Sequence, residues 1–164
     1  YNLILHYGVD SFIEQSKKAN VSGFIIPDLP YEEAQEFNLK AKNASIDHIM
    51  LVAPTSDNSR IEKIAQISSG FIYLVSSTGV TGVRENFSSL IGDVLTKIKA
   101  VTDTPVAVGF GISKIEHLKN LNEMDVNGAI IGSAIIKIIR ENKKNMDDML
   151  LKVSDYIDNL YKND

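Results

Sequence analysis

Short apolar runs recur along the chain and alternate with longer amphipathic stretches. The runs are rich in β-branched residues and lack polar alternation, which is typical of strands buried on both faces of a parallel sheet. This pattern predicts strands at residues 23–26, 48–53, 71–75, 106–108 and 128–131.

Between these runs, apolar residues spaced three and four apart among charges predict helices that each cover one face of the sheet. The expected helices are 10–19, 31–43, 58–67, 87–101 and 113–122, followed by a short apolar helix at 134–139 and a terminal helix at about 146–161. The order is strand then helix throughout, and no low-complexity linker interrupts it, so we expect residues 1–164 to form a single domain.

The opening stretch, Tyr1 to Leu5, is apolar and has no initiating Met, so we expect it to be the tail of a preceding strand in an N-terminally truncated chain. Five strand-helix units plus this tail fit either an open doubly wound sheet or most of an eight-stranded barrel. A full barrel takes about 250 residues, so length alone favours the open sheet. An incomplete barrel would expose two unpaired strand edges, and we expect such a chain to aggregate or to be partly ordered.

The residues at the predicted strand ends change this preference. Parallel α/β folds collect their chemistry there, and three successive strand ends carry Gly with Ser or Thr, which expose N–H groups and hydroxyls to an anion. Gly132-Ser133 leads directly into the helix expected at 134–139, and a helix N-terminus favours phosphate. Barrels bind phosphate after strands seven and eight, where 109–113 and 132–134 fall if 128–131 is strand eight. We therefore predict a partial (β/α)8 TIM barrel.

Composition excludes several classes of function. The net charge of −4 offers no attraction to nucleic acid or anionic lipid, and the longest apolar stretch, 128–139, is too short to span a membrane. The chain has no cysteine, which suits a cytoplasmic protein, and His6, His48 and His117 lack the spacing of metal ligands. We therefore expect no metal site. No nucleotide-binding glycine motif is present, so a nucleotide cofactor is not implied either.

Four segments, taken in order, are similar to the tryptophan synthase alpha chain family. They are Asp28-Leu-Pro30, Ser77-Thr-Gly-Val-Thr-Gly82, Gly109-Phe-Gly-Ile-Ser113 and Gly132-Ser-Ala-Ile-Ile-Lys137. The resemblance extends over essentially the whole chain. It implies a TIM-barrel lyase of tryptophan biosynthesis that cleaves indole-3-glycerol phosphate to indole and glyceraldehyde 3-phosphate. It also implies an α2β2 complex with a beta chain, which would hold the only pyridoxal phosphate.

The same resemblance assigns roles to individual residues. Gly82, Gly111, Gly132 and Ser133 would bind the substrate and its phosphate, and Thr81 would lie with Gly82 on a mobile sixth loop that closes over the site. The pocket would be lined by Tyr73, Phe110, Ile25, Leu51 and Ile130. The family's catalytic Glu and Asp would lie upstream of Tyr1, so this chain alone is expected to be inactive.

Asp28 is the one carboxylate expected at a strand end facing this pocket. It could support the site or contact the partner chain, or it could be a turn residue before the helix at 31–43. Two other functions remain open. One is another phosphosugar barrel enzyme, an isomerase or epimerase, and the other is a non-catalytic regulatory subunit that activates a beta chain.

Overall fold

The computed structural model describes residues 1–75, 84–109 and 115–161, without the side chains of residues 84–90. Its helices are α1 (Asn2–Tyr7), α2 (Val9–Lys18), α3 (Tyr31–Asn43), α4 (Asn58–Ile67), α5 (Arg84–Lys99), α6 (Ile115–Asn122), α7 (Ser133–Asn142) and α8 (Met146–Tyr161). Its strands are β1 (Gly23–Ile25), β2 (Asp47–Ile49), β3 (Leu51–Val52), β4 (Ile72–Val75), β5 (Val106–Gly109) and β6 (Gly128–Ile130).

Every strand pair is parallel, and the strands follow their order in the sequence. The predicted strand at 48–53 is divided at Met50, because β2 pairs with β1 whereas β3 pairs with β4. The Met50 carbonyl accepts a hydrogen bond of 3.0 Å from the Tyr73 amide, so the extended segment changes partners without leaving the sheet. The six strands therefore occupy five positions, as the five predicted strands require.

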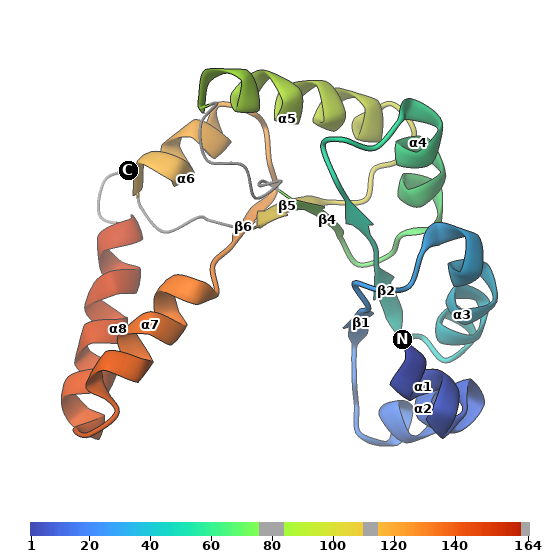
Figure 1. Cartoon of the computed structure of the whole chain (residues 1–164), viewed down its shortest axis with the longest axis horizontal. Helices are drawn as coiled ribbons and strands as arrows, with labels where there is room; N and C mark the ends of the chain where they lie inside the picture. Colours follow the sequence, from blue (N-terminus) through green and yellow to red (C-terminus); the bar gives the residue numbers. More distant parts are fainter. Residues whose placement is uncertain (76–83, 110–114, 162–164) are drawn as a thin grey trace.

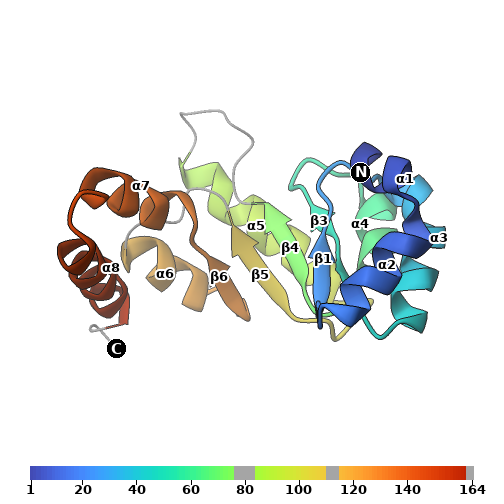
Figure 2. The same cartoon turned by 90° about the horizontal axis from the view of Figure 1, so that it is seen from below.

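The strands form an arc, with α3, α4 and α5 on its convex side (Figure 1). Seen along the other direction, the strands lie side by side from β1 to β6, with α1 and α2 at one end of the arc and α7 and α8 at the other (Figure 2). This is the arrangement of part of a barrel, and it confirms the predicted parallel α/β fold.

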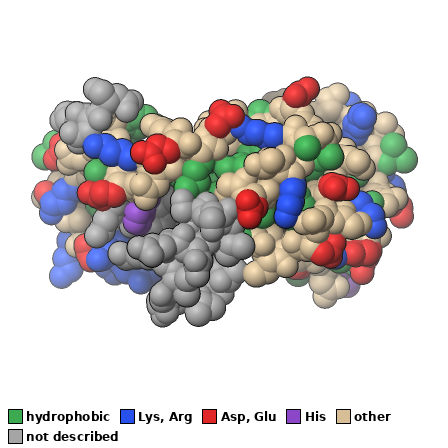
Figure 3. All heavy atoms as spheres, turned by 90° about the horizontal axis from the view of Figure 1, so that it is seen from above, with side chains coloured by type: hydrophobic (Ala, Val, Ile, Leu, Met, Phe, Trp, Pro, Cys, Tyr) green, Lys and Arg blue, Asp and Glu red, His purple; other side chains and the backbone are tan. Residues whose placement is uncertain are grey.

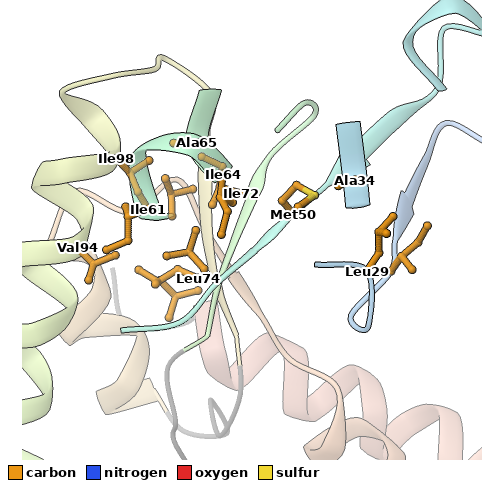
Figure 4. Close-up of a cluster of buried hydrophobic side chains, with 14 of the residues drawn as sticks. Leu29, Ala34, Met50, Ile61, Ile64, Ala65, Ile72, Leu74, Val94 and Ile98 are labelled. Atoms are coloured by element: carbon orange, nitrogen blue, oxygen red, sulfur yellow. The ribbon is translucent and has the colours of Figure 1, made fainter. Parts of the chain in front are cut away.

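The hydrophobic core lies between the convex face of the sheet and the helices that cover it. Ile72 and Leu74 of β4 are fully buried there against the apolar sides of α4 and α5, together with Ile61 and Ile98 (Figure 4). Alternate residues of the same strands face the other way, so the concave face carries a separate set of side chains. Over the face shown in Figure 3, acidic and basic side chains are interspersed.

The opening stretch differs from its prediction, because Asn2–Tyr7 forms α1 instead of the tail of a strand. A strand here would leave its backbone groups unpaired, since β1 pairs only with β2 within the described residues. A helix satisfies these groups internally: the amides of Ile4 and Leu5 donate to the Tyr1 carbonyl at 2.9 and 3.1 Å. Gly8, at φ 94°, then ends the helix in a conformation that favours glycine.

Within the described residues, no helix combines the length and apolar character needed to cross a membrane.

Candidate functional site

The carboxyl ends of β1, β3 and β4 surround a hollow of about 480 Å³. Its walls are mostly apolar and include Leu29, Leu51 and Val75, and its polar groups include those of Asp28, Ser56 and Arg60. A concave, largely apolar site with a few polar groups is the usual form of a small-molecule pocket. The hollow lies at the strand ends, and of the described residues predicted for the site, Asp28 and Leu51 are in its lining.

Asp28 borders this hollow but its carboxylate is already engaged. It forms an ion pair with the amino group of Tyr1, and the hydrogen bond from that group lowers the pKa of the Asp28 carboxyl below its usual value. The side chain remains 66% exposed. Asp28 is therefore ionised and accessible, which does not suit a general acid at neutral pH.

Arg60 is held at the same hollow by Glu32. Its two terminal nitrogens donate to the two carboxylate oxygens at 2.7 and 3.3 Å, which joins α4 to α3. α4 itself is capped by Asp57, whose carboxylate accepts a 2.9 Å hydrogen bond from the Arg60 amide. This side of the hollow is therefore built from two linked helices, of which α4 has a side-chain cap.

Four of the side chains expected to line the pocket belong to described residues, and these four lie on one face of the sheet. Leu51 and Tyr73 are register partners on β3 and β4, so their side chains lie side by side. Ile25 is the register partner of Ile49, which precedes Leu51 by two residues, so the Ile25 and Ile49 side chains lie on the same face. The next side chain along β1, Phe24, points to the opposite face, toward α2 and α3. Ile130 shares the face of its partner Gly109 on β5, one layer nearer the strand ends than Tyr73. The concave face therefore brings together Ile25, Leu51, Tyr73 and Ile130.

Small residues on β5 and β6 leave space beside Tyr73 on this face. Its register partner is Ala107, which in turn pairs with Gly128. A Cβ on Gly109 would come within 2.6 Å of Tyr73 Cε1, so the phenol ring occupies the place of a side chain at residue 109. Partial burial raises the pKa of the Tyr73 hydroxyl, which therefore stays protonated at neutral pH.

Gly109 is a residue of this face that sequence analysis did not assign to the pocket. The alternation of side chains along a strand shows that residues 107 and 109 share one face of β5. Placing them beside Tyr73 also requires the register between β4 and β5. That register is a property of the assembled sheet.

Gly132 and Ser133 lie where β6 ends and α7 begins. Gly132 precedes the first helical residue, and the Ile136 amide donates to its carbonyl at 3.0 Å. Within the described residues this end has no side-chain cap hydrogen bond and both residues are exposed, so the described structure leaves the first amides of α7 open to an anion. No described atom lies within 4 Å of a Cβ built on Gly132, so packing in the described structure does not require glycine there.

Thr81, Gly82, Phe110 and Gly111 lie outside the described residues. In the described part of the chain, no three His, Cys, Asp or Glu side chains gather in a way that could hold a metal ion. A second hollow, of about 250 Å³, lies between α6, β6 and α8 and includes Leu118, Ile131 and Leu160 in its wall.

Comparison with known proteins gives consistent matches to one family. The sequence profile described as tryptophan synthase alpha chain matches residues 1–163. Tryptophan synthase alpha chains from Picosynechococcus sp. and Acaryochloris marina are 49% and 46% identical over 137 and 141 residues, covering 84% and 86% of this chain. These matches cover 52% and 53% of the two relatives, so the chain spans about half of their length.

Solved structures agree with the sequence matches. A structure of the tryptophan synthase α2β2 complex from the hyperthermophile Pyrococcus furiosus superimposes with a TM-score of 0.80 at 33% identity. The match covers 98% of this chain and 63% of that one. The tryptophan synthase alpha subunit of Campylobacter jejuni gives 0.81 at 30% identity, covering 93% and 60%.

Proposed function

Because the chain belongs to the tryptophan synthase alpha chain family, we propose that it carries the phosphate-binding part of a lyase site that cleaves indole-3-glycerol phosphate to indole and glyceraldehyde 3-phosphate. The observation that carries this proposal is the open N-terminus of α7, which follows β6 directly and adjoins the apolar concave face. An anion site beside an apolar surface matches the two ends of this substrate.

The phosphate would be bound by the first amides of α7, with Gly132 allowing close approach and the Ser133 hydroxyl adding a donor. The helix dipole favours negative charge at the same point. By family resemblance, Gly111 would join them from the segment after β5, and Thr81 and Gly82 would belong to a loop that closes over the substrate.

The indole would lie on the concave face against Ile25, Leu51 and Ile130, with Tyr73 beside it and Phe110 contributing from beyond β5. Burial of an aromatic ring against such side chains is favourable at about 25 cal/mol per Å² of apolar area removed from water. The arrangement of these described side chains on one face supports the proposal.

The reaction needs an acid that protonates the indole ring carbon and a base that takes the hydroxyl proton of the side chain. The carbon–carbon bond then breaks, and the former alcohol carbon leaves as the aldehyde. Among the described strand residues only Asp47 is a carboxylate, at the amino end of β2, far from the proposed phosphate site along the strand direction. We therefore propose that the acid and base come from outside these 164 residues and that the chain alone is inactive.

The proposed reaction needs no cofactor on this chain, and pyridoxal phosphate would belong to the beta chain of an α2β2 complex. Contact with that partner would use loops around the carboxyl ends of the strands, where Asp28 lies. The proposed location is the cytoplasm.

Calorimetric titration of the chain with indole-3-glycerol phosphate, followed by an assay for released indole, tests the proposal. We expect saturable binding that glyceraldehyde 3-phosphate weakens by competition, without release of indole. Absence of binding would contradict the proposed site. Indole release above background would show that the acid and base lie within this chain.

A further inference from the structure

The amino end of β6 is joined to β5 by both the backbone and the side chain of one residue. The Asn127 amide donates to the Val106 carbonyl at 3.0 Å, and Asn127 Oδ1 accepts from the Val106 amide at 2.8 Å. Val106 is only 1% exposed, and a buried amide that loses its acceptor is costly. The Asn127 side chain therefore supplies an acceptor that the Val106 amide needs.

The turn that leads into Asn127 is held from α5. Asp125 has a φ of 54°, a left-handed conformation that is uncommon for a residue other than glycine. Lys99, the last residue of α5, donates to the Asp125 carbonyl at 2.5 Å and forms an ion pair with its carboxylate. The chain therefore enters β6 between two fixed points, Lys99 of α5 and Val106 of β5.

The strand that follows is short, and the site lies just beyond it. β6 has three residues, and within the described part of the chain it pairs only with β5 (Figure 2). This pairing places Ile130 opposite Gly109, on the concave face. A slip of one residue would turn Ile130 to the other face and move the start of α7 by about 3.3 Å. The position of Gly132 and Ser133 therefore depends on the register of β6.

We propose that Asn127 is a positioning residue for the phosphate site, acting from the opposite end of β6 without touching the anion. Its Oδ1 holds β6 in register with β5, and the strand then places the first amides of α7 beside the concave face. The role requires an oxygen acceptor at this position, so aspartate can replace asparagine whereas alanine cannot. The identity of the ligand rests on the proposed function, whereas the register of β6 does not.

Nuclear magnetic resonance of the chain measures the register directly. Cross-strand contacts between Val108 and Ala129 report it, and hydrogen exchange of the Val106 amide reports the bond to Asn127. We expect Asn127→Ala to displace the Val108–Ala129 contacts and to speed exchange of the Val106 amide about tenfold or more. Asn127→Asp should keep the contacts and the exchange rate of the unsubstituted chain.

Contacts that stay unchanged in Asn127→Ala would overturn the proposal, whatever the exchange rate. A folded Asn127→Asp chain that loses the contacts would also overturn it, so the test does not depend on the alanine variant alone. Circular dichroism checks that each variant is folded.

Calorimetric titration with indole-3-glycerol phosphate tests the effect on the site. Asn127→Ala should weaken binding about tenfold or more, and Asn127→Asp should restore it. Asn142→Ala is the matched control at the other end of α7, where the Asn142 side chain donates to the Ile138 carbonyl at 2.8 Å and accepts from Lys152 at 2.6 Å. This control should leave the affinity unchanged. Equal weakening by the two alanine variants would assign the effect to lost stability and overturn the positioning role.

The two measurements distinguish the role of Asn127 from the proposed function. A displaced β6 in Asn127→Ala, together with no binding by the unsubstituted chain, would leave the register role established and count against the phosphate site. Binding by the unsubstituted chain, together with the same register and affinity in Asn127→Ala, would leave the proposed function standing and overturn the role of Asn127.

Discussion

The phenol ring of Tyr73 lies where a side chain at Gly109 would be, with Tyr73 Cε1 only 2.6 Å from a Cβ built on the glycine. The two residues come from adjacent strands, β4 and β5, and lie in successive layers of the concave face. Glycine at 109 therefore sets the position of the one tyrosine proposed to border the indole. The effects of substitutions at the two residues on the free energy of unfolding should therefore be coupled.

Gly109→Ala should lower the free energy of unfolding by about 1–3 kcal/mol, as overpacking of a closely fitted site does. In the Tyr73→Ala background the same substitution should cost less than about 0.5 kcal/mol, because the clash is gone. Urea unfolding of the four proteins in the cycle measures the coupling.

Gly92→Ala is the matched control for this cycle. Gly92 lies within α5 and no described atom is within 4 Å of its added Cβ, so alanine should stabilise the chain by about 0.5–1 kcal/mol through helix propensity. Equal destabilisation by Gly109→Ala with and without Tyr73 would contradict the account of the concave face.

His48 should make stability depend on pH. Its side chain is buried beside Phe37, with ring centroids 5.0 Å apart, and Nδ1 donates to Asn38 Oδ1 while Nε2 has no partner in the described structure. Burial lowers the pKa of His48 to about 4, below its ordinary value of 6.5. The unfolded chain thus takes up the proton first as pH falls. The resulting stability is complete above pH 6.5 and is lost as pH falls toward 4, by about 3 kcal/mol.

Chemical denaturation between pH 7.5 and 4 measures this effect. His48→Gln should flatten the part of the stability curve that lies between pH 6.5 and 4. A His48→Gln curve with the original slope would assign the pH dependence to other groups.

Phe37 should dominate the stability of the end of the arc that contains β1. Its buried ring contacts the rings of Tyr1, Phe24 and His48 at 5.9, 5.8 and 5.0 Å between centroids. Phe37→Ala should cost about 3–5 kcal/mol, the usual loss for a buried aromatic ring. Leu39→Ala on the same helix should change stability by less than about 0.5 kcal/mol, since Leu39 is exposed. Thermal unfolding compares the two, and similar losses would contradict the assigned core.

Sequence predicts the elements best where local chemistry defines their ends. The observed bounds of α3 and α4 equal the predicted ones, because Pro30 and Asp57 stand at their N-termini and fix where each helix begins. The stretch at 1–5 was misassigned because a short apolar run fits a strand and a helix equally well, and the absence of a strand neighbour decides for the helix.

The candidate site divides in the same way. Gly132 and Ser133 could be recognised from sequence, since a glycine and a hydroxyl before an apolar helix are a local signal. The packing of the Tyr73 ring against Gly109 and the division of the strand at Met50 could not be predicted from sequence. Both depend on which strands pair and in what register. The exposure of the apolar side chains of α7 and α8 could not be predicted either, because an amphipathic helix has the same sequence pattern whether or not a neighbour covers it.

The most direct test of the proposed phosphate site follows backbone amide resonances while indole-3-glycerol phosphate is added to the chain. We expect the largest shifts at Ser133 and Ala134. Ser133→Asp should weaken binding about tenfold or more by placing a negative charge at the anion site, although an acidic residue suits the first turn of a helix. Ser59→Asp, which adds the same charge to the first turn of α4, should leave the affinity unchanged. Shifts that bypass the start of α7, or equal losses in the two variants, would contradict the account.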